Sequence, residues 1–565
     1  MLYFILIFAH ILHIECFYSS GVNRISSLKM AVDHEVDVAV IGSGIAGSTI
    51  SFLLQERYDC KVALIDPCVN TEGHWYPNYG EWRDEWHALS DLLQLPELKL
   101  CTTTEWEITD CFFGGSNGIP IDTRTTLPRP YVRVDRIKMQ ALLRSKFFKA
   151  NGISIPSKLS STRVNTNIFD KNLAHTENGS ILTLDNGDIV RCKVVVDTSG
   201  LESKLICKED PMFARANRKT IPVGFQIAYG FIAHVDSLGP YDKNAMTLFD
   251  YKTNHLEGEQ FIDATNRPTF MYAMPLGQLS DGTYRIFFEE TSLVGKDKRR
   301  LSFEECKDRA LKRLKFHNIN ILGVEEEEFC YIPMGGELPD LTQRVIAFGG
   351  AANMVHPSTG YHACRMLAAA TDFATAIGNG VKENLKPDII SINAYKTLWF
   401  EENRWQRSFQ VFGGDFLMQQ NVDKLRGFFS AFFALEQPSW SGFLAGWPNL
   451  PGNEYHDSWY KRLIFALNLF LKMPNDVRIS MIVFSILHTI EYGPFTLVRS
   501  LVPSFVVGDG PGNPSYEKPP IIIGDENAKQ EARLMMKQFK PSATSKGRIV
   551  SNNIETAESM PAPFN

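Results

Sequence analysis

The stretch VDVAVIGSGIAGSTISFLLQ, residues 36–55, contains the pattern that decides the fold. Its first six residues are an apolar run that predicts a short strand, and its last eleven predict a helix. Between them, Gly42, Gly44 and Gly47 have the spacing GxGxxG. The segment CKVALID, residues 60–66, predicts a second strand that ends in an acid. Together these segments predict a strand–turn–helix–strand unit that binds a dinucleotide.

Each part of this unit has a physical role toward a dinucleotide. The first glycine permits the tight turn, the second lets the backbone approach a pyrophosphate, and the third lets the helix pack closely on the strand. The helix N terminus supplies amide donors and a favourable dipole for the phosphates. Asp66 ends the second strand, where an acid binds ribose hydroxyls. The residues of this unit predicted to hold the dinucleotide are Gly42, Ser43, Gly44, Ala46, Gly47 and Asp66.

Two later glycine turns indicate which dinucleotide is bound. They are VVVDTSG at 194–200 and FGGAANMVHPSTG at 348–360. In FAD-binding folds a distant glycine turn completes the N-terminal unit beside the flavin. A single N-terminal unit, a β-rich region and a return to such a turn favour FAD over NAD. We therefore expect Gly349 and Gly350 to contact FAD; the alternative for each turn is an ordinary strand–helix connection.

Hydropathy and turn residues predict an α/β protein, with a Rossmann-like FAD-binding domain interrupted by an antiparallel β-sheet and followed by a helical region. Within the first part, residues 84–130 are expected to be irregular, with short strands. The predicted segments are 1–30 (targeting), 36–220 (first part of the FAD-binding region), 221–340 (β-rich substrate domain), 341–380 (return turn and helix of the FAD-binding region), 381–505 (helical, membrane-associating C-terminal region) and 506–565 (disordered tail).

Composition excludes several classes of function. The chain has 565 residues and a formal net charge of -6, and no block of Lys or Arg appears, so a nucleic-acid partner is not expected. The ten cysteines include no CxxC pair, which predicts reduced thiols rather than a zinc site or a disulfide framework. No metal site is predicted.

The N terminus has the features of a targeting segment. MLYFILIFAHILHI is an apolar run, and the FYSSGVNRISSLKM that follows it is rich in Ser and free of acids. This order predicts import into a plastid through the secretory route. Simple secretion, or a true start at Met30, is the alternative.

Motifs spread in order over about residues 36–500 resemble the plant and algal lycopene β- and ε-cyclases, which belong to the flavoprotein hydroxylase-like superfamily. The segments that carry the resemblance are GSGIAG (42–47), NYGEWRDE (78–85), RPYVRVDR (129–136), FQIAYG (225–230), TFMYAMP (269–275), FFEETSL (287–293), IPMGGELP (332–339), GGAANMVHPSTGY (349–361) and FFALEQPSWSGFL (432–444).

The resemblance implies a lycopene β-cyclase that closes the acyclic ψ-end groups of lycopene into β-ionone rings, toward γ- and β-carotene. It implies carbocation chemistry started by an acid, with FAD required in reduced form, NADPH as its reductant and no net redox change. HPSTGY and the LAAA at 367–370 look more like the β type. The alternatives are an ε-cyclase, a cyclase-like paralogue acting on epoxy-carotenoids, an FAD-dependent isoprenoid monooxygenase and a carotenoid-binding protein.

The strand TYRIFFEET contains two acids, Glu289 and Glu290. Because side chains alternate along a strand, only one of them can line a pocket, and the period does not say which. The family's essential acid corresponds to the first, so the resemblance implies that Glu289 is the proton donor. A carboxyl buried among apolar groups keeps its proton because burial raises its pKa.

Other candidate residues lie in segments expected to be loops or helix starts. Asp84 and Glu85, in a loop with three aromatic residues, are predicted to position the flavin or to act as a base; the alternative is a pair of solvated acids. Arg133 is predicted to contact the flavin phosphate or ring, unless it forms a salt bridge. His356 lies in the turn expected to face the flavin, although a lone histidine is more often structural.

Two C-terminal segments, 460–472 and 476–490, are apolar but too short to span a bilayer. Each is long enough to lie in a membrane interface, which predicts monotopic association with a thylakoid or envelope membrane. Buried core helices are the alternative, and a membrane of the secretory pathway is the alternative location. The expected partners are lycopene or a related carotenoid, the membrane surface and, among proteins, other carotenoid-pathway enzymes.

Overall fold

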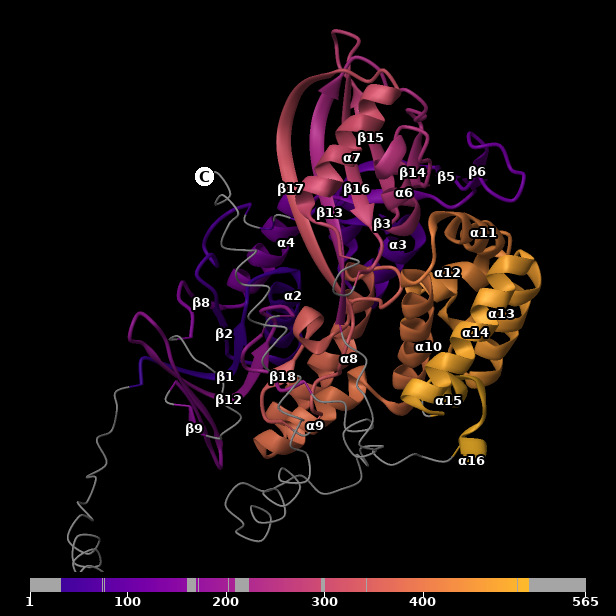
Figure 1. Cartoon of the computed structure of the whole chain (residues 1–565). Coiled ribbons are helices and arrows are strands. Elements are labelled where there is room, and N and C mark those ends of the chain that lie inside the picture. Colours follow the sequence, from indigo (N-terminus) through magenta and orange to yellow (C-terminus); the bar gives the residue numbers. More distant parts are fainter. Residues whose placement is uncertain are drawn as a thin grey trace, which may run out of the picture.

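The computed structural model describes residues 32–73, 75, 77–159, 169–170, 172–201, 203–208, 223–295, 300–341, 343–494 and 496–507. The predicted targeting segment 1–30 lies outside the described residues, and so does all but the first two residues of the predicted tail 506–565. Figure 1 shows the β1-containing sheet at the lower left, a second sheet at the top and the C-terminal helices at the right.

The first sheet contains the predicted dinucleotide unit. Its strands run in the order β8-β2-β1-β12-β11-β10-β9, and β18 also pairs with β12. The pairs β8·β2, β2·β1, β1·β12 and β12·β18 are parallel, and the remaining pairs are antiparallel. The bounds are β1 His34–Ile41, β2 Val62–Ile65, β8 Ile153–Ile155, β9 Phe169–Asp170, β10 Leu173–Thr176, β11 Gly179–Thr183, β12 Ile189–Asp197 and β18 Ile346–Ala347. Strand β2, for example, is apolar and buried along its whole length because both faces of the sheet are covered there.

Helix α2 (Ile45–Tyr58) packs on β1 and β2 of this sheet, and α4 (Arg136–Lys149) and α8 (Ala363–Lys382) pack against α2. Small residues allow α8 to approach α2 closely: a Cβ added at Gly378 would lie 2.1 Å from Cγ of Tyr58. The return segment therefore folds back on the N-terminal unit, as the glycine turns predicted.

The second sheet has the order β17-β13-β16-β15-β14-β5-β6. All its pairs are antiparallel except β14·β5, which is parallel. The bounds are β5 Ile108–Phe112, β6 Arg124–Leu127, β13 Val223–Val235, β14 Ala245–Asp250, β15 Thr269–Gln278, β16 Tyr284–Ser292 and β17 Ile321–Gly335, with α6 Gly258–Asn266 and α7 Phe303–Phe316 beside them. The predicted fold class, a Rossmann-like α/β unit with an inserted sheet and a helical C-terminal region, is confirmed. The sheet also takes up β5 and β6 from the preceding segment.

The segment 78–86, expected to be a loop, is instead a strand followed by a helix. Strands β3 (Gly80–Trp82), β7 (Tyr131–Val134) and β4 (Thr102–Trp106) form a small sheet, and α3 (Arg83–Leu92) follows β3 directly. Trp82 and Trp86 are fully buried, so tertiary packing fixes a segment whose own pattern is irregular. A helical first turn also suits acids, because the N-terminal end of a helix dipole is positive.

The predicted helical region after residue 381 is confirmed, and it packs largely through aromatic side chains. Its helices are α9 Pro387–Leu398, α10 Glu401–Met418, α11 Val422–Phe433, α12 Gln437–Ala445, α13 Trp459–Lys472, α14 Asn475–Tyr492, α15 Leu497–Leu501 and α16 Ser504–Val507. Among the described residues, none of the helices is both long enough and apolar enough to cross a membrane.

Candidate functional site

The glycine turn after β1 is held by Asp66. The carboxylate of Asp66 accepts hydrogen bonds from the backbone N–H groups of Ser43 (2.9 Å) and Cys68 (2.7 Å). Asp66 thus ties the end of β2 to the turn, while its side chain remains partly exposed. Because a carboxylate accepts about four hydrogen bonds, this arrangement leaves capacity for a ribose hydroxyl.

The glycines of the turn differ in what surrounds them. A Cβ added at Gly47 would lie 1.8 Å from the carbonyl oxygen of Gly42, so this position must be glycine for the helix to pack. Gly42 itself has φ +98°. At Gly44, in contrast, no atom of the described residues lies within 4 Å of an added Cβ. The open face at Gly44, at the uncapped N terminus of α2, suits a pyrophosphate.

The two later glycine turns meet this unit, as FAD binding requires. A Cβ added at Gly350 would lie 3.2 Å from Cα of Gly200, and one added at Gly349 would lie 3.0 Å from Cβ of Ala46. Gly349 has φ +66°, the left-handed region that favours glycine. The residues Ser43, Ala46, Gly349 and Gly350 therefore come together around the start of α2.

The two acids of FFEET face opposite sides of the second sheet, as alternation predicts. Glu290 is fully buried and forms a two-point ion pair with Arg313 of α7, with both N–O distances 2.9 Å. It also accepts a hydrogen bond from the hydroxyl of Thr269. The cation of Arg313 therefore balances the charge of Glu290, and the ion pair holds α7 on the sheet.

Glu289 lies on the other face, half-buried, beside a second glutamate. Gly230 of β13 is the cross-strand neighbour of both Glu289 on β16 and Glu328 on β17. An added Cβ at Gly230 would lie 2.8 Å from the ring of Phe287 and 3.4 Å from Cγ of Glu289, so the glycine leaves room for the Phe287 ring beside the acid. A carboxylate oxygen from each acid and the sulfur of Cys330 lie within 4.8 Å of one another. Burial and the charge of Glu328 raise the pKa of Glu289 to about 8, whereas the Thr291 hydroxyl acts to lower it.

Glu328 has more hydrogen-bond donors than Glu289. It accepts from the backbone N–H of Asn78 (3.1 Å), from the Asn78 side chain and from the thiol of Cys330 (2.7 Å). Donors of this kind stabilise a carboxylate. Glu289 accepts from the Thr291 hydroxyl at 2.8 Å. Burial raises the pKa of Glu328 as well, but its donors act to lower it, so the arrangement favours the proton of this pair on Glu289.

Arg133 lies in the same network. Its guanidinium donates to the side-chain oxygen of Asn78 and, at 3.4 Å, to the hydroxyl of Thr103. It is nearly buried, and burial lowers its pKa. The structure thus places Arg133 behind Asn78, next to Glu328; contact with a flavin phosphate or ring stays a prediction.

Asp84 and Glu85 lie in the first turn of α3, and both bind Arg129. Nη2 of the buried Arg129 donates to Asp84 (2.9 Å) and to Glu85 (2.8 Å), and the guanidinium lies 4.4 Å above the ring of Trp82. Asp84 is exposed to solvent, whereas Glu85 is buried. The loop expected here is therefore the first turn of a helix, and the helix directs only Glu85 inward; a role of either acid toward the flavin or as a base stays a prediction.

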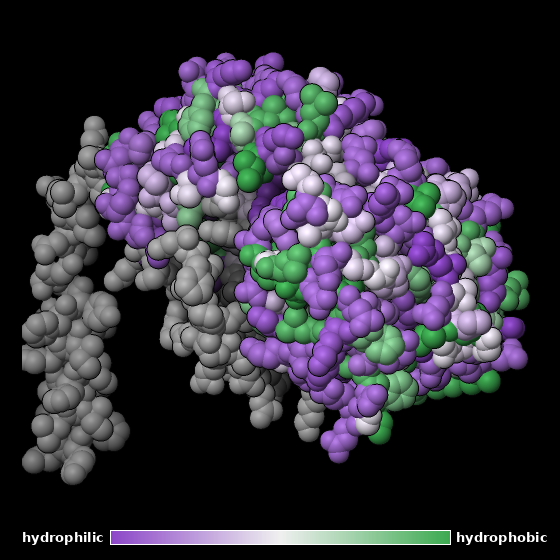
Figure 2. All heavy atoms as spheres, turned by 90° about the horizontal axis from the view of Figure 1, so that it is seen from above, coloured by the Kyte–Doolittle hydropathy of each residue, from purple (hydrophilic) through white to green (hydrophobic). Residues whose placement is uncertain are grey.

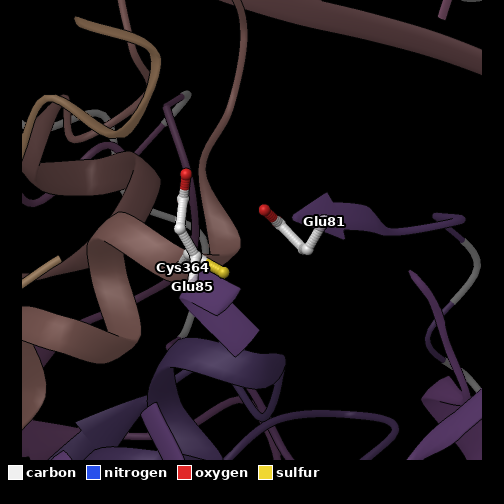
Figure 3. A group of neighbouring side chains, drawn as sticks. All are labelled: Glu81, Glu85 and Cys364. Carbon is white, nitrogen blue, oxygen red and sulfur yellow. The ribbon is translucent and has the colours of Figure 1, made fainter. Parts of the chain in front are cut away.

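Glu85 has a close neighbour in Glu81. Figure 3 shows the Glu81 side chain pointing from β3 toward Glu85 and the sulfur of Cys364, and the three ligand atoms lie within 4.8 Å of one another. Glu81 is 2% exposed. Burial and the charge of Glu85 raise the pKa of Glu81 to about 8; burial raises that of Glu85 to about 7, although Arg129 acts to lower it.

These two groups, Glu81–Glu85–Cys364 and Glu289–Glu328–Cys330, are the sets among the described residues with spacing that could hold a metal ion. In the first group the Arg129 cation contacts Glu85, and burial raises the pKa of Glu81 in that group and of Glu289 in the other. The sequence analysis did not select Glu81, Glu328 or Arg129. Glu328 lies in the run EEEEF at 325–329. The two-residue period of a strand places its side chain on the same face as that of Glu326.

His356 is fully buried, and both ring nitrogens have backbone partners. Nε2 donates to the carbonyl of Phe443 (2.9 Å), and Nδ1 accepts from the N–H of Ser358 (3.1 Å). Burial holds its pKa well below the usual range, so the ring is neutral. His356 fixes the turn 356–361 against α12, which matches the structural alternative.

Comparison with known proteins gives one family and several relatives. The family model described as lycopene cyclase protein matches residues 37–454. The chain is 35% identical to the chloroplastic lycopene beta cyclase of Arabidopsis thaliana over 450 residues, which is 79% of each chain. It is 33% identical to the chromoplastic capsanthin/capsorubin synthase of Citrus sinensis, over 72% of this chain and 74% of that protein. Among solved structures, a geranylgeranyl bacteriochlorophyll reductase-like protein from Thermoplasma acidophilum has a TM-score of 0.49 at 14% identity, covering 71% of this chain and 92% of that one.

Proposed function

Since the chain belongs to the lycopene cyclase family, we propose that it closes the acyclic ψ-end groups of lycopene into β-ionone rings without net redox change. The single observation that carries this proposal is Glu289, a proton-bearing carboxyl beside Glu328 on a face lined by aromatic side chains. An acyclic polyene end offers neither a metal ligand nor a carbonyl, so ring closure has to start from an acid.

The proposed reaction balances as an isomerisation. The O–H proton of Glu289 adds to the terminal double bond, and the electron pair of that double bond forms the new C–H bond. The next double bond attacks the resulting cation, which closes the ring. A C–H bond beside the new cation then breaks, its electrons form the ring double bond, and its proton passes to a base. Aromatic faces near Glu289 tolerate the intermediate cation because their π-systems attract positive charge.

Two groups are candidates for the base. Arg129 holds Glu85 and its neighbour Asp84 in the first turn of α3. Glu81 lies beside Glu85. Because both carboxyl groups have a pKa near neutral pH, the Glu81–Glu85 pair can take up a proton at working pH. We propose this pair as the proton acceptor, with Asp84 and Arg129 as positioning residues.

FAD is the cofactor of this proposal. The open Gly44 face, the uncapped start of α2 and Asp66 support binding of its pyrophosphate and ribose, and Gly349 and Gly350 support the end nearer the flavin ring. Bound in reduced form, with NADPH as reductant, FAD would supply an electron-rich ring that favours the cation and would not be consumed. The residues of the chain then have only to orient the polyene, exclude water and move protons.

Expression in a lycopene-accumulating bacterium, followed by pigment chromatography and mass spectrometry, tests the proposal. We expect bicyclic or monocyclic products of the same mass as lycopene, with β-rings. A product heavier by one oxygen would assign the chain to the monooxygenases, and ε-rings would assign it to the other cyclase type.

The relative named capsanthin/capsorubin synthase favours a second candidate, a cyclase-like paralogue that acts on epoxy-carotenoids. Protonation by Glu289 would there open an epoxide ring and rearrange the cation instead of closing a linear end. Incubation with an epoxy-carotenoid distinguishes the two: conversion of this pigment, with lycopene left unchanged, would replace the cyclase proposal.

We also propose that the chain works on a plastid membrane surface. Helices α13 and α14 each expose a face of apolar side chains. These helices lie at the right in Figure 1, and Figure 2 shows apolar residues along the same right-hand rim. The exposed residues are Tyr460, Ile464, Leu467 and Leu471 on α13, and Ile479, Ile482, Val483, Ile486, Leu487 and Ile490 on α14. Their spacing places them along one side of each helix, a pattern suited to an interface.

Names of relatives support the plastid, since these are chloroplastic and chromoplastic proteins. A fusion of residues 1–40 to a fluorescent protein tests the location and the secretory route together. Fluorescence within the plastid supports import, and fluorescence confined to the endomembranes or medium contradicts it.

A further inference from the structure

A cavity opens between the second sheet and the C-terminal helices, away from the glycine turns. Its volume is about 220 Å³, and it lies between the loop after β5, the helix α11 and the turn that joins α13 to α14. Its lining includes Phe113 from the loop, Ser430 and Ala431 from α11, Ala434 directly after that helix, Lys472 at the end of α13 and Pro474 from the turn. The cavity thus adjoins the end of the exposed apolar face of α13.

Aromatic rings continue inward from this cavity. Phe113, at the cavity wall, stacks on Phe429 with ring centroids 5.9 Å apart and an interplanar angle of 16°. Phe429 in turn stacks on Phe249 of β14 at 5.2 Å and 26°. Phe249 lies 6.1 Å from Tyr272 of β15. The rings therefore form one continuous series from the cavity to the sheet.

The series ends at the acid. Tyr272 and Glu289 are directly opposed on β15 and β16, and opposed residues of an antiparallel pair share a face. From Phe249 to Glu289 the path crosses two strand spacings, about 10 Å. Phe429, Phe249, Tyr272 and Glu289 are all half-buried. They keep accessible surface, although Phe113, which begins the series, is 3% exposed. A row of partly accessible rings inside the protein is what a passage requires.

We propose that this cavity is the port through which the end group of a linear polyene enters, and that Phe113, Phe429, Phe249 and Tyr272 line its way to Glu289. The inference rests on the proposed function and adds the route of the substrate. Flat aromatic faces suit a conjugated hydrocarbon, which gains from burial and stacking and offers no hydrogen bond. The cavity adjoins the membrane-facing side of α13, so the polyene can pass from a bilayer to the acid without crossing water.

Blocking the port tests this route in the full-length holoenzyme. Ser430→Trp and Ala434→Trp each place a bulky ring at the cavity, whereas Gln437→Trp places one on an exposed position three residues further on that does not line it. Each protein is mixed with phosphatidylcholine vesicles that contain lycopene. Polyene binding is measured by the shift of its absorption band and cyclisation by chromatography, with flavin content and melting temperature as checks on the fold.

We expect the two blocking variants to lose at least tenfold in both binding and cyclisation rate, and the Gln437→Trp variant to remain within twofold of the wild type. Blocking variants that retain flavin and melting temperature and yet bind lycopene as the wild type does would overturn the port. If the wild type binds lycopene through this port but does not cyclise it, the proposed function fails while the port stands.

A second measurement applies should either tryptophan variant fail to fold. Ser430→Cys, purified in its folded state and then modified with a bulky maleimide, closes the port after folding, and Gln437→Cys is its matched control with the same native thiols. Loss of polyene binding in the first and not in the second supports the route; equal binding in both contradicts it.

Discussion

Glu289 and Glu328 lie on two different strands and face each other across Gly230 of the strand between them. Each is two residues from a hydrogen-bond donor on its own strand, the hydroxyl of Thr291 and the thiol of Cys330 respectively. Because two adjacent carboxyl groups, one buried and one half-buried, cannot both ionise without strong repulsion, the pair is expected to hold a proton at neutral pH. This relationship gives the first two predictions.

Glu289→Gln should reduce cyclisation by 10²- to 10⁴-fold, the usual contribution of a general acid, because the amide has no transferable proton. Flavin content and lycopene binding should remain, and pigment chromatography with flavin absorbance measures all three. The comparison is Glu290→Gln, which weakens a buried ion pair with Arg313 and should lower stability by about 3 kcal/mol. If Glu290→Gln is inactive although folded, and Glu289→Gln is active, the roles of the two acids are reversed.

The pH dependence follows from the raised pKa of Glu289, about 8. An acid must be protonated to act, so ionisation of Glu289 should make the cyclisation rate fall tenfold per pH unit above this value. Glu328→Gln removes a charge that raises the pKa, so the falling limb should move to lower pH. Glu327→Gln, on the other face of the strand and paired with Lys307, is the control. A reduced rate with an unmoved limb would mean that Glu328 acts only on the fold.

Gly44→Val should abolish flavin binding without unfolding the chain. No atom of the described residues lies within 4 Å of an added Cβ at this position, and its extended backbone accepts a β-branched residue. The side chain would therefore occupy only the space meant for the pyrophosphate. Gly47→Ala gives the contrast: its Cβ would lie 1.8 Å from the oxygen of Gly42, so the protein should lose stability. Flavin absorbance and thermal melting distinguish the two, and a yellow Gly44→Val protein would contradict the site.

Glu81→Gln should make the protein less sensitive to rising pH. The folded pKa of Glu81, about 8, lies above the value of about 4.3 for an unfolded glutamate. Between these values the unfolded chain releases a proton that the folded chain keeps, so stability falls by about 1.4 kcal/mol per pH unit. The variant lacks this loss. Melting temperatures from pH 5 to pH 8 measure it, with the exposed Glu72→Gln as control; equal slopes would show that Glu81 is ionised in the fold.

Charges on the face of α13 and α14 should weaken membrane binding. Leu471 and Ile490 are 68% and 75% exposed, and burying such a side chain contributes about 1.5–3 kcal/mol. The double variant Leu471→Glu/Ile490→Glu should therefore lower partitioning into vesicles at least tenfold in a flotation assay, with melting unchanged. Ile137→Glu, at an exposed apolar position on α4, should have no effect. Equal flotation of all three proteins would contradict the membrane face.

The sequence by itself determined the elements whose pattern is local. Strand β1, the turn at Gly42–Gly47 and helix α2 follow from an apolar run, glycines at fixed spacing and a helical segment, and all three depend on neighbours within a few residues. The separation of Glu289 from Glu290 is likewise local, because a strand has a period of two. The family motifs, in their order along the chain, also predicted that the β-rich region interrupts the dinucleotide-binding unit and that the helical region follows it.

Only the tertiary structure decided what depends on register and packing. Glu328 meets Glu289 only because β16 and β17 each pair with β13 in one particular register. Glu290 acts as a structural acid because Arg313 of α7 forms an ion pair with it. Trp82 and Trp86 are fully buried, so a segment expected to be a loop became β3 and α3. Nothing local in the chain encodes these contacts, since each joins residues far apart in sequence and forms only when the sheets and helices close on one another.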